Sequence, residues 1–256
     1  MDDYIKLTKT KKFIGVQPVT FSKNSFDKNT NYYTTYKLDG KRHLYLNGFL
    51  ITSKLEFIPY KLKAPKDTIL DGELYENTFY VFDILFYKGQ DIRNLSTSER
   101  INLLQKIPKL TLKPYWTPYT NSLKENFTEI KNKYKNEMKI NGMVDGIIFT
   151  PDQPYTSKVL KWKPINLLSI DFKIKKQEPN TFKLLRHDNK IYTKTIVTKK
   201  QFDSYKDCSV VEFVYKGDKF VPIRSRPDKI NSNYITVIKD NMYQIKNPVN
   251  INKLLS

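Results

Sequence analysis

The stretch that decides the fold is "YKLDGKR", residues 36–42. It follows an alternating, β-branched run and precedes a second run of alternating apolar residues, so we predict a strand on each side. The Asp39-Gly40 pair is typical of a tight turn between such strands. A second interpretation is that Lys37, at the end of the first strand, is a nucleophile. Other parts of the sequence must decide between them.

Composition narrows the class of protein. The chain has 256 residues, of which 39% are hydrophobic, so it is long enough for a folded core of one or two domains. The formal net charge of +19 favours polyanionic partners, which include nucleic acid, nucleotides or an acidic membrane surface. No apolar stretch is long enough to span a bilayer. The single cysteine excludes an intrachain disulfide and indicates a reducing compartment.

The pattern along the chain changes at Pro164. Before it, we predict strands, a hairpin at Asn47-Gly48, a helix that begins with the capping box of Ser96 and Glu99, and a second helix over 123–139. After it, antiparallel strands with polar turns are followed by a final helix that starts near Ser232. We therefore predict two domains, residues 1–164 and 165–256.

Three Asp-Gly pairs occur, at 39–40, 71–72 and 145–146. Any one of them alone is more often a turn than a site. Their order along the chain carries more information, because each lies beside further charged or aromatic residues. The ordered stretches are "KLDGKR", "LDGEL" with "YVFDIL", "VDGIIF", "LKWKP" and "IRSRPDK".

This ordered set resembles the covalent nucleotidyltransferase superfamily, which includes mRNA capping guanylyltransferases and ATP-dependent polynucleotide ligases. The resemblance runs from about residue 32 to the C-terminus. Asp145, "KWKP" and "RSRPDK" favour the capping branch, and the short chain rich in Lys, Asn, Ile and Tyr suggests the viral type. The resemblance implies an α+β fold: a nucleotidyltransferase domain of ATP-grasp-like antiparallel sheets with helices, then an OB-fold lid with a C-terminal helix.

The implied reaction has two steps. Lys37 attacks the α-phosphate of GTP to form a covalent lysyl-GMP and pyrophosphate, and GMP then passes to the 5′-diphosphate end of an RNA. An ordinary lysine has a pKa near 10.4, whereas only a neutral amine attacks, so such a site needs nearby cations and desolvation. Arg42, Lys161 and Lys163 are the cations that this sequence offers. Strand alternation places Lys161 and Lys163 on one face, although a solvated lysine face is the competing interpretation.

The resemblance also implies the remaining site residues. Glu73 and Asp145 would hold Mg²⁺ or Mn²⁺, while a turn role for Asp71 is at least as well supported as a ligand role. Phe82 would stack on the guanine and Ile148 would lie on its opposite face, although such strand residues are usually core. The other nucleotide contacts would come from Asp39 and, in the lid, from Arg224, Arg226, Asp228 and Lys229 at the β- and γ-phosphates.

Two alternatives remain at this point. An ATP-dependent RNA or DNA ligase shares much of the motif set, and spacing alone does not separate guanine from adenine. A non-catalytic RNA-binding subunit with the same fold is the other.

The chain has no obvious room for an RNA triphosphatase or a cap methyltransferase, so both are expected on other proteins or on other parts of a longer polypeptide. The expected compartment is the cytoplasm, a host's in the case of a virus, rather than the nucleus.

Overall fold

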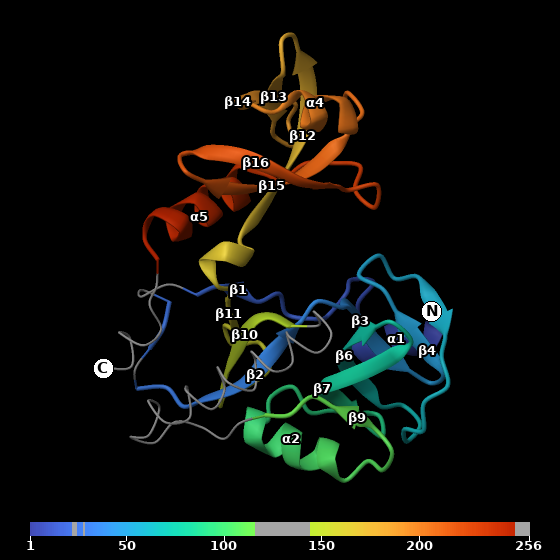
Figure 1. The fold of residues 1–256 in the computed structure, drawn as a ribbon. Helices are drawn as coiled ribbons and strands as arrows, with labels where there is room; N and C mark the ends of the chain where they lie inside the picture. Colours follow the sequence, from blue (N-terminus) through green and yellow to red (C-terminus); the bar gives the residue numbers. More distant parts are fainter. Residues whose placement is uncertain (22–24, 28, 116–143, 249–256) are drawn as a thin grey trace. The chain divides into compact units, whose positions relative to one another are not determined.

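The computed structural model describes residues 1–21, 25–27, 29–115 and 144–248 (Figure 1). The chain divides into two compact units, the first of which ends at Trp162 while the second begins at Lys163. This division lies two residues before the predicted boundary. The helix predicted over 123–139 lies outside the described residues. No helix in the described ranges is both long enough and apolar enough to cross a membrane.

The first unit contains two sheets, which are mostly antiparallel. A seven-stranded sheet has the order β5 (Phe57–Pro59), β4 (Phe49–Ile51), β3 (Lys41–Leu46), β6 (Ile69–Tyr75), β7 (Thr78–Tyr87), β8 (Gln90–Asp91), and β9 (Thr111–Leu112) pairs with β7 in parallel. A four-stranded sheet has the order β1 (Val19–Thr20), β11 (Leu160–Trp162), β10 (Val144–Pro151), β2 (Tyr32–Leu38).

Local sequence signals account for several of these elements. The hairpin between β3 and β4 turns at Asn47 and Gly48, whose φ angles of 45° and 92° lie in the left-handed region that this turn requires. Helix α2 (Thr97–Gln105) begins with the predicted capping box, in which the Ser96 side chain accepts from the Glu99 N–H and Glu99 accepts from the Ser96 N–H. Both predictions are confirmed. Helix α1 (Asp2–Thr8) was not predicted.

The Asp-Gly pairs do not all form turns. Asp39 and Gly40 lie in the turn between β2 and β3, as predicted, but the turn interpretation is wrong for the other two pairs. Pair 71–72 lies inside β6 and pair 145–146 inside β10, each at a shift in strand register. A Cβ on Gly72 would stand 2.6 Å from the Phe79 ring, so close packing against β7 explains this glycine.

The second unit is built on a five-stranded antiparallel sheet. Its order is β14 (Ile191–Ile196), β13 (Thr181–Leu185), β12 (Ser169–Gln177), β15 (Val210–Lys216), β16 (Lys219–Ser225). The sheet curls, since the Thr195 hydroxyl on β14 donates to the carbonyl of Phe220 on β16 at 2.7 Å. A short 3-10 helix, η1 (Ile165–Leu167), precedes the sheet, α4 (Lys199–Ser204) joins β14 to β15, and α5 (Ile235–Lys246) closes the described chain.

Candidate active site

A cavity of about 200 Å³ in the first unit lies between strands of both sheets. The strands bring side chains from distant parts of the sequence to its wall, because residues two apart on a strand share a face. Six residues that the sequence motifs singled out line it together: Lys37, Arg42, Glu73, Phe82, Ile148 and Lys161.

Lys37 lies on β2, and its amine is hydrogen-bonded to a carboxylate. The Nζ atom lies 2.7 Å from Asp145 Oδ1, and the two side chains are 19% and 16% exposed. Asp145 is the extra residue of a bulge, because Val144 pairs with Leu38 and Gly146 pairs with Lys37. The carboxylate therefore holds the end of the Lys37 side chain in place at the cavity.

Arg42 is held by a buried network beneath the cavity. Its Nε donates to Asp71 Oδ1 at 3.0 Å and its Nη2 to Asp71 Oδ2 at 2.6 Å, while Nη1 donates to the Val16 carbonyl. The Tyr155 hydroxyl accepts from Nη2 at 3.0 Å and donates to Asp71. Burial opposes the charge of Arg42, but the Asp71 carboxylate outweighs burial and raises the pKa of Arg42. Asp71 is thus neither a turn residue nor exposed, and it orients Arg42.

Lys113 is a site residue that the sequence motifs did not reveal. It is 5% exposed, lines the same cavity, and forms an ion pair with Glu73. Its Nζ lies 4.9 Å from the centroid of the Phe82 ring, within the range of a cation–π contact. Burial lowers the pKa of Lys113, although Glu73 opposes this shift. The segment "TLKP" carries no signal for this role, because the contact arises only from the packing of β9 beside β7.

Thr35 adds a polar group with no protein partner. It lies two residues before Lys37 on β2, is 2% exposed and lines the cavity. Its Oγ1 is buried and has no hydrogen-bond partner among the described residues. Because a buried hydroxyl without a partner is costly, this atom is a candidate contact for a bound ligand.

Glu73 and Asp145 are the carboxylates that the sequence analysis assigns to a metal ion. The described residues hold no cluster of three or more His, Cys, Asp or Glu side chains arranged for a metal ion. Glu73 and Asp145 each pair with a lysine instead, Lys113 and Lys37 respectively. Mg²⁺ usually takes one or two protein carboxylates and completes its shell with water and substrate phosphates, so the carboxylates of Glu73 and Asp145 are of the donor type that Mg²⁺ prefers.

The other predicted residues lie elsewhere. Asp39 is exposed in the turn after β2, and Lys163 opens the second unit, beyond the end of β11. The residues predicted for a lid surround two buried carboxylates of the second unit, Asp171 and Glu212. Ion pairs join Arg224 to Glu212, Arg226 to Asp171, Glu212 and Asp228, and Lys229 to Asp171.

These lid residues differ in how accessible they are. The Arg224 side chain is 63% exposed, whereas that of Arg226 is 17% exposed. The hydrogen bonds from Arg226 lower the pKa of Asp228 to about 2. A phosphate would therefore meet Arg224 first and would compete with carboxylates for Arg226.

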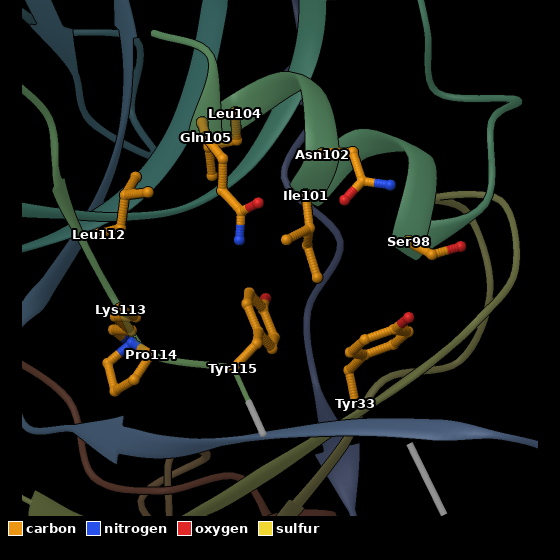
Figure 2. A pocket seen from close by; sticks show the side chains of 10 residues that line it. All are labelled: Tyr33, Ser98, Ile101, Asn102, Leu104, Gln105, Leu112, Lys113, Pro114 and Tyr115. Atoms are coloured by element: carbon orange, nitrogen blue, oxygen red, sulfur yellow. The ribbon is translucent and has the colours of Figure 1, made fainter. Parts of the chain in front are cut away.

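A second cavity, of about 400 Å³, lies beside α2 (Figure 2). Figure 2 shows Ile101, Asn102 and Gln105 of the helix facing it, with Tyr33 on the opposite side. It shares Lys113 and Tyr115 with the first cavity. Lys113 is the one charged residue among the described residues that line it, so the smaller cavity is the better candidate for phosphate chemistry.

Comparisons with known proteins identify the family to which this sequence is similar. Residues 2–165 match the family described as "mRNA capping enzyme, catalytic domain". The mRNA-capping enzyme subunit alpha of Candida glabrata is 29% identical over 67% of this chain, and that of Yarrowia lipolytica is 26% identical over 95%. The chain spans 51% of the length of the first relative and 81% of the second.

The chain is also similar to solved structures. One of them, titled "DNA binding with a minimal scaffold: Structure-function analysis of Lig E DNA ligases", matches 84% of this chain at 14% identity, with a TM-score of 0.46. The family match covers more than half of the chain. The chain therefore belongs to the family of mRNA capping enzyme catalytic domains.

Proposed function

We propose that this protein is an mRNA guanylyltransferase. In the first step, the Lys37 amine forms a bond to the α-phosphorus of GTP while the bond from that phosphorus to pyrophosphate breaks. In the second step, a terminal phosphate oxygen of a 5′-diphosphate RNA displaces Lys37 and forms the 5′–5′ triphosphate cap. The observation that carries the proposal is the Lys37 amine in a cavity that also holds Arg42, Lys113 and Lys161.

The side chains have separate tasks in this proposal. Lys37 attacks as the neutral amine, and Asp145 accepts its hydrogen bond and orients it. Arg42 and Lys161 stabilise charge on the phosphates, which is the main task of a protein in phosphoryl transfer. Glu73 and Asp145 would hold Mg²⁺, which neutralises charge on the pyrophosphate leaving group.

The second unit would act as the lid. We propose that it is an OB fold, which is supported by five antiparallel strands, a helix between the third and fourth, and contact between the third and fifth. The β- and γ-phosphates would be met by Arg224, Arg226, Asp228 and Lys229.

RNA triphosphatase and cap methyltransferase activities would reside elsewhere. The single cysteine is consistent with a cytoplasmic protein.

Label transfer tests the function directly. The protein is incubated with Mg²⁺ and GTP labelled at the α-phosphate, and in parallel with labelled ATP, before a denaturing gel. We expect a labelled protein band with GTP, its reversal by pyrophosphate, and its loss when the metal is chelated.

The other outcomes separate the alternatives. A band with ATP alone would move the protein to the ligases. No band with either nucleotide, from protein that circular dichroism shows to be folded, would refute the enzymatic function and favour an RNA-binding subunit.

Thr35 gives a prediction in which stability and binding change differently. Thr35→Val keeps the shape of the side chain but removes the unpartnered hydroxyl, so we expect thermal stability to stay the same or rise. If the hydroxyl binds the nucleotide, KM for GTP should rise by roughly 2- to 10-fold. Thermal unfolding and the rate of label transfer measure the two effects, and an unchanged KM would exclude the contact.

Lys113 gives a prediction about the base. Its ammonium group only donates hydrogen bonds, and guanine offers the O6 acceptor where adenine carries an amino donor. With Lys113 beside Phe82, Lys113→Met should reduce the preference for GTP over ATP by about tenfold or more. The ratio of label-transfer efficiencies measures this, with Lys109→Met, at an exposed lysine before β9, as the control. An unchanged ratio would remove Lys113 from base selection.

A further inference from the structure

Three lysines stand directly opposite one another on neighbouring strands of the second unit. Lys175 on β12 pairs with Lys183 on β13, and Lys183 pairs with Lys194 on β14. Neighbouring strands are about 4.8 Å apart, so these side chains form a row across three strands, which we name the lysine row. Figure 1 shows the three strands next to one another.

The lysine row points away from the core of its unit. The next residues along the strands, Ile174, Phe182 and Thr195, are all buried. Side chains alternate between the two faces of a strand, so the lysines occupy the outer face. Lys175 and Lys194 are exposed and Lys183 is half-buried.

The lysine row is unfavourable for the protein alone. Like charges directly opposite one another destabilise a sheet. No ion pair within 4.0 Å joins any of the three to a carboxylate in the described part of the chain. The charge of Lys175 does contribute to lowering the pKa of Asp207, which also accepts from the Lys176 N–H at 2.7 Å. One nearby carboxylate against three ammonium groups leaves net repulsion, which a bound polyanion would relieve.

We propose that the lysine row binds the phosphate backbone of the acceptor RNA. This proposal rests on the proposed function, because it names the surface that holds the second substrate. Asp171, Glu212 and Arg224 form another cross-strand row on the same face, four residues from Lys175 along β12, or about 13 Å. The Arg224 side chain in that row is 63% exposed, so it adds a further exposed cation on the same face.

An RNA fits this face better than an acidic protein does. An RNA backbone carries one charge at every nucleotide and is held without regard to sequence, which suits evenly spaced lysines. Ile196, two residues from Lys194 on the same face, is 75% exposed and offers an apolar surface beside the phosphates.

The test compares two triple variants of the full chain. Lys175→Gln with Lys183→Gln and Lys194→Gln removes the row, and Lys199→Gln with Lys200→Gln and Lys239→Gln removes three exposed helix lysines of the same unit as the matched control. Fluorescence anisotropy measures binding to a 5′-diphosphate RNA of about 20 nucleotides, longer than common single-strand sites, across a range of KCl concentrations. For the row variant we expect the slope of log K against log salt to fall by about 2, and affinity at about 0.1 M salt to fall at least tenfold. The control should change far less.

GMP adduct formation separates this proposal from the proposed function. That step needs no RNA, so the row variant should form the labelled GMP adduct as the unaltered protein does. In the transfer step, its KM for long RNA should rise. If the unaltered protein forms no adduct, the proposed function fails, yet the RNA measurement still stands. An equal salt slope in the two triple variants would overturn the proposal. Tighter binding of poly-glutamate of matched charge than of RNA would overturn it too, in favour of a protein partner.

Discussion

Lys37→Ala is expected to form no detectable GMP adduct, because it removes the only atom that the proposed mechanism uses to attack phosphorus. Loss of a covalent nucleophile elsewhere lowers turnover on the order of 10⁶-fold, so the labelled band should vanish rather than weaken. The measurement is label transfer from GTP under single-turnover conditions. The variant also removes the ion pair with Asp145, so folding must be checked by circular dichroism.

Two controls make the Lys37 result specific. Lys37→Arg keeps a cation for Asp145 but remains protonated, so we expect it to fold normally and still form no adduct. Lys41→Ala removes an exposed lysine four positions away and should label normally. A persistent band in Lys37→Ala would assign the nucleophile to another lysine, and Lys113 and Lys161 line the same cavity.

Arg100→Met is expected to destabilise the protein by about 3–5 kcal/mol, because it leaves a buried carboxylate without its partner. The Arg100 side chain is 1% exposed, and its Nε and Nη2 donate to the two oxygens of Asp83 at 2.8 and 3.0 Å. Urea unfolding of both proteins measures the cost. The double variant Arg100→Met with Asp83→Asn should recover part of the loss, since it removes the orphaned charge.

The cost of Arg100→Met should depend on pH. Burial raises the pKa of Asp83 even in the presence of Arg100, and the variant removes the group that opposes this shift. The pKa of an aspartate in the unfolded chain is about 3.9. When folding raises the pKa of a carboxyl group, the group stabilises the fold at a pH below the unfolded pKa. This stabilisation is lost as the pH rises through the higher pKa of the folded protein. The variant should therefore be closer to the unaltered protein at about pH 5 than at about pH 8. A pH-independent difference would contradict this explanation.

An exposed pair of the same geometry provides the control. Arg93 donates to both oxygens of Asp91 at 2.9 and 2.6 Å, but the two side chains are 27% and 45% exposed. Because water stabilises both charges there, Arg93→Met should cost less than about 1 kcal/mol at any of these pH values. Equal costs for the two arginines would mean that burial does not set the penalty.

Sequence pattern predicted the elements that depend on neighbours in the chain. Alternation located the strands on both sides of the Asp39-Gly40 turn, and the Ser96 capping box located the start of α2, because each signal is local. The meeting of Lys37, Glu73 and Phe82 in one cavity was expected from the order of motifs and not from spacing.

Contacts between distant segments escaped prediction. Asp71 orients Arg42 and Tyr155 completes the network, yet in sequence Asp71 looks like half of a turn and Tyr155 like an ordinary aromatic. Lys113 resembles any other lysine in a chain with 45 basic residues. Helix α1 is anchored by the Tyr4 hydroxyl, which donates to the Lys12 carbonyl at 2.8 Å, and no short-range pattern reveals such a contact.

The bulge in β10 makes the site depend on the number of residues in the strand as well as on their identity. Asp145 is the additional residue between the pairs Val144–Leu38 and Gly146–Lys37. Deletion of Asp145 itself would remove the bulge together with the carboxylate, and deletion of a later residue would turn the side chains beyond it to the opposite face. In evolutionary terms, a substitution in this strand keeps its register, whereas a single-codon deletion would lose the carboxylate or shift the register beside Lys37. Libraries built for directed evolution should hold the length of 144–151 fixed while its composition varies.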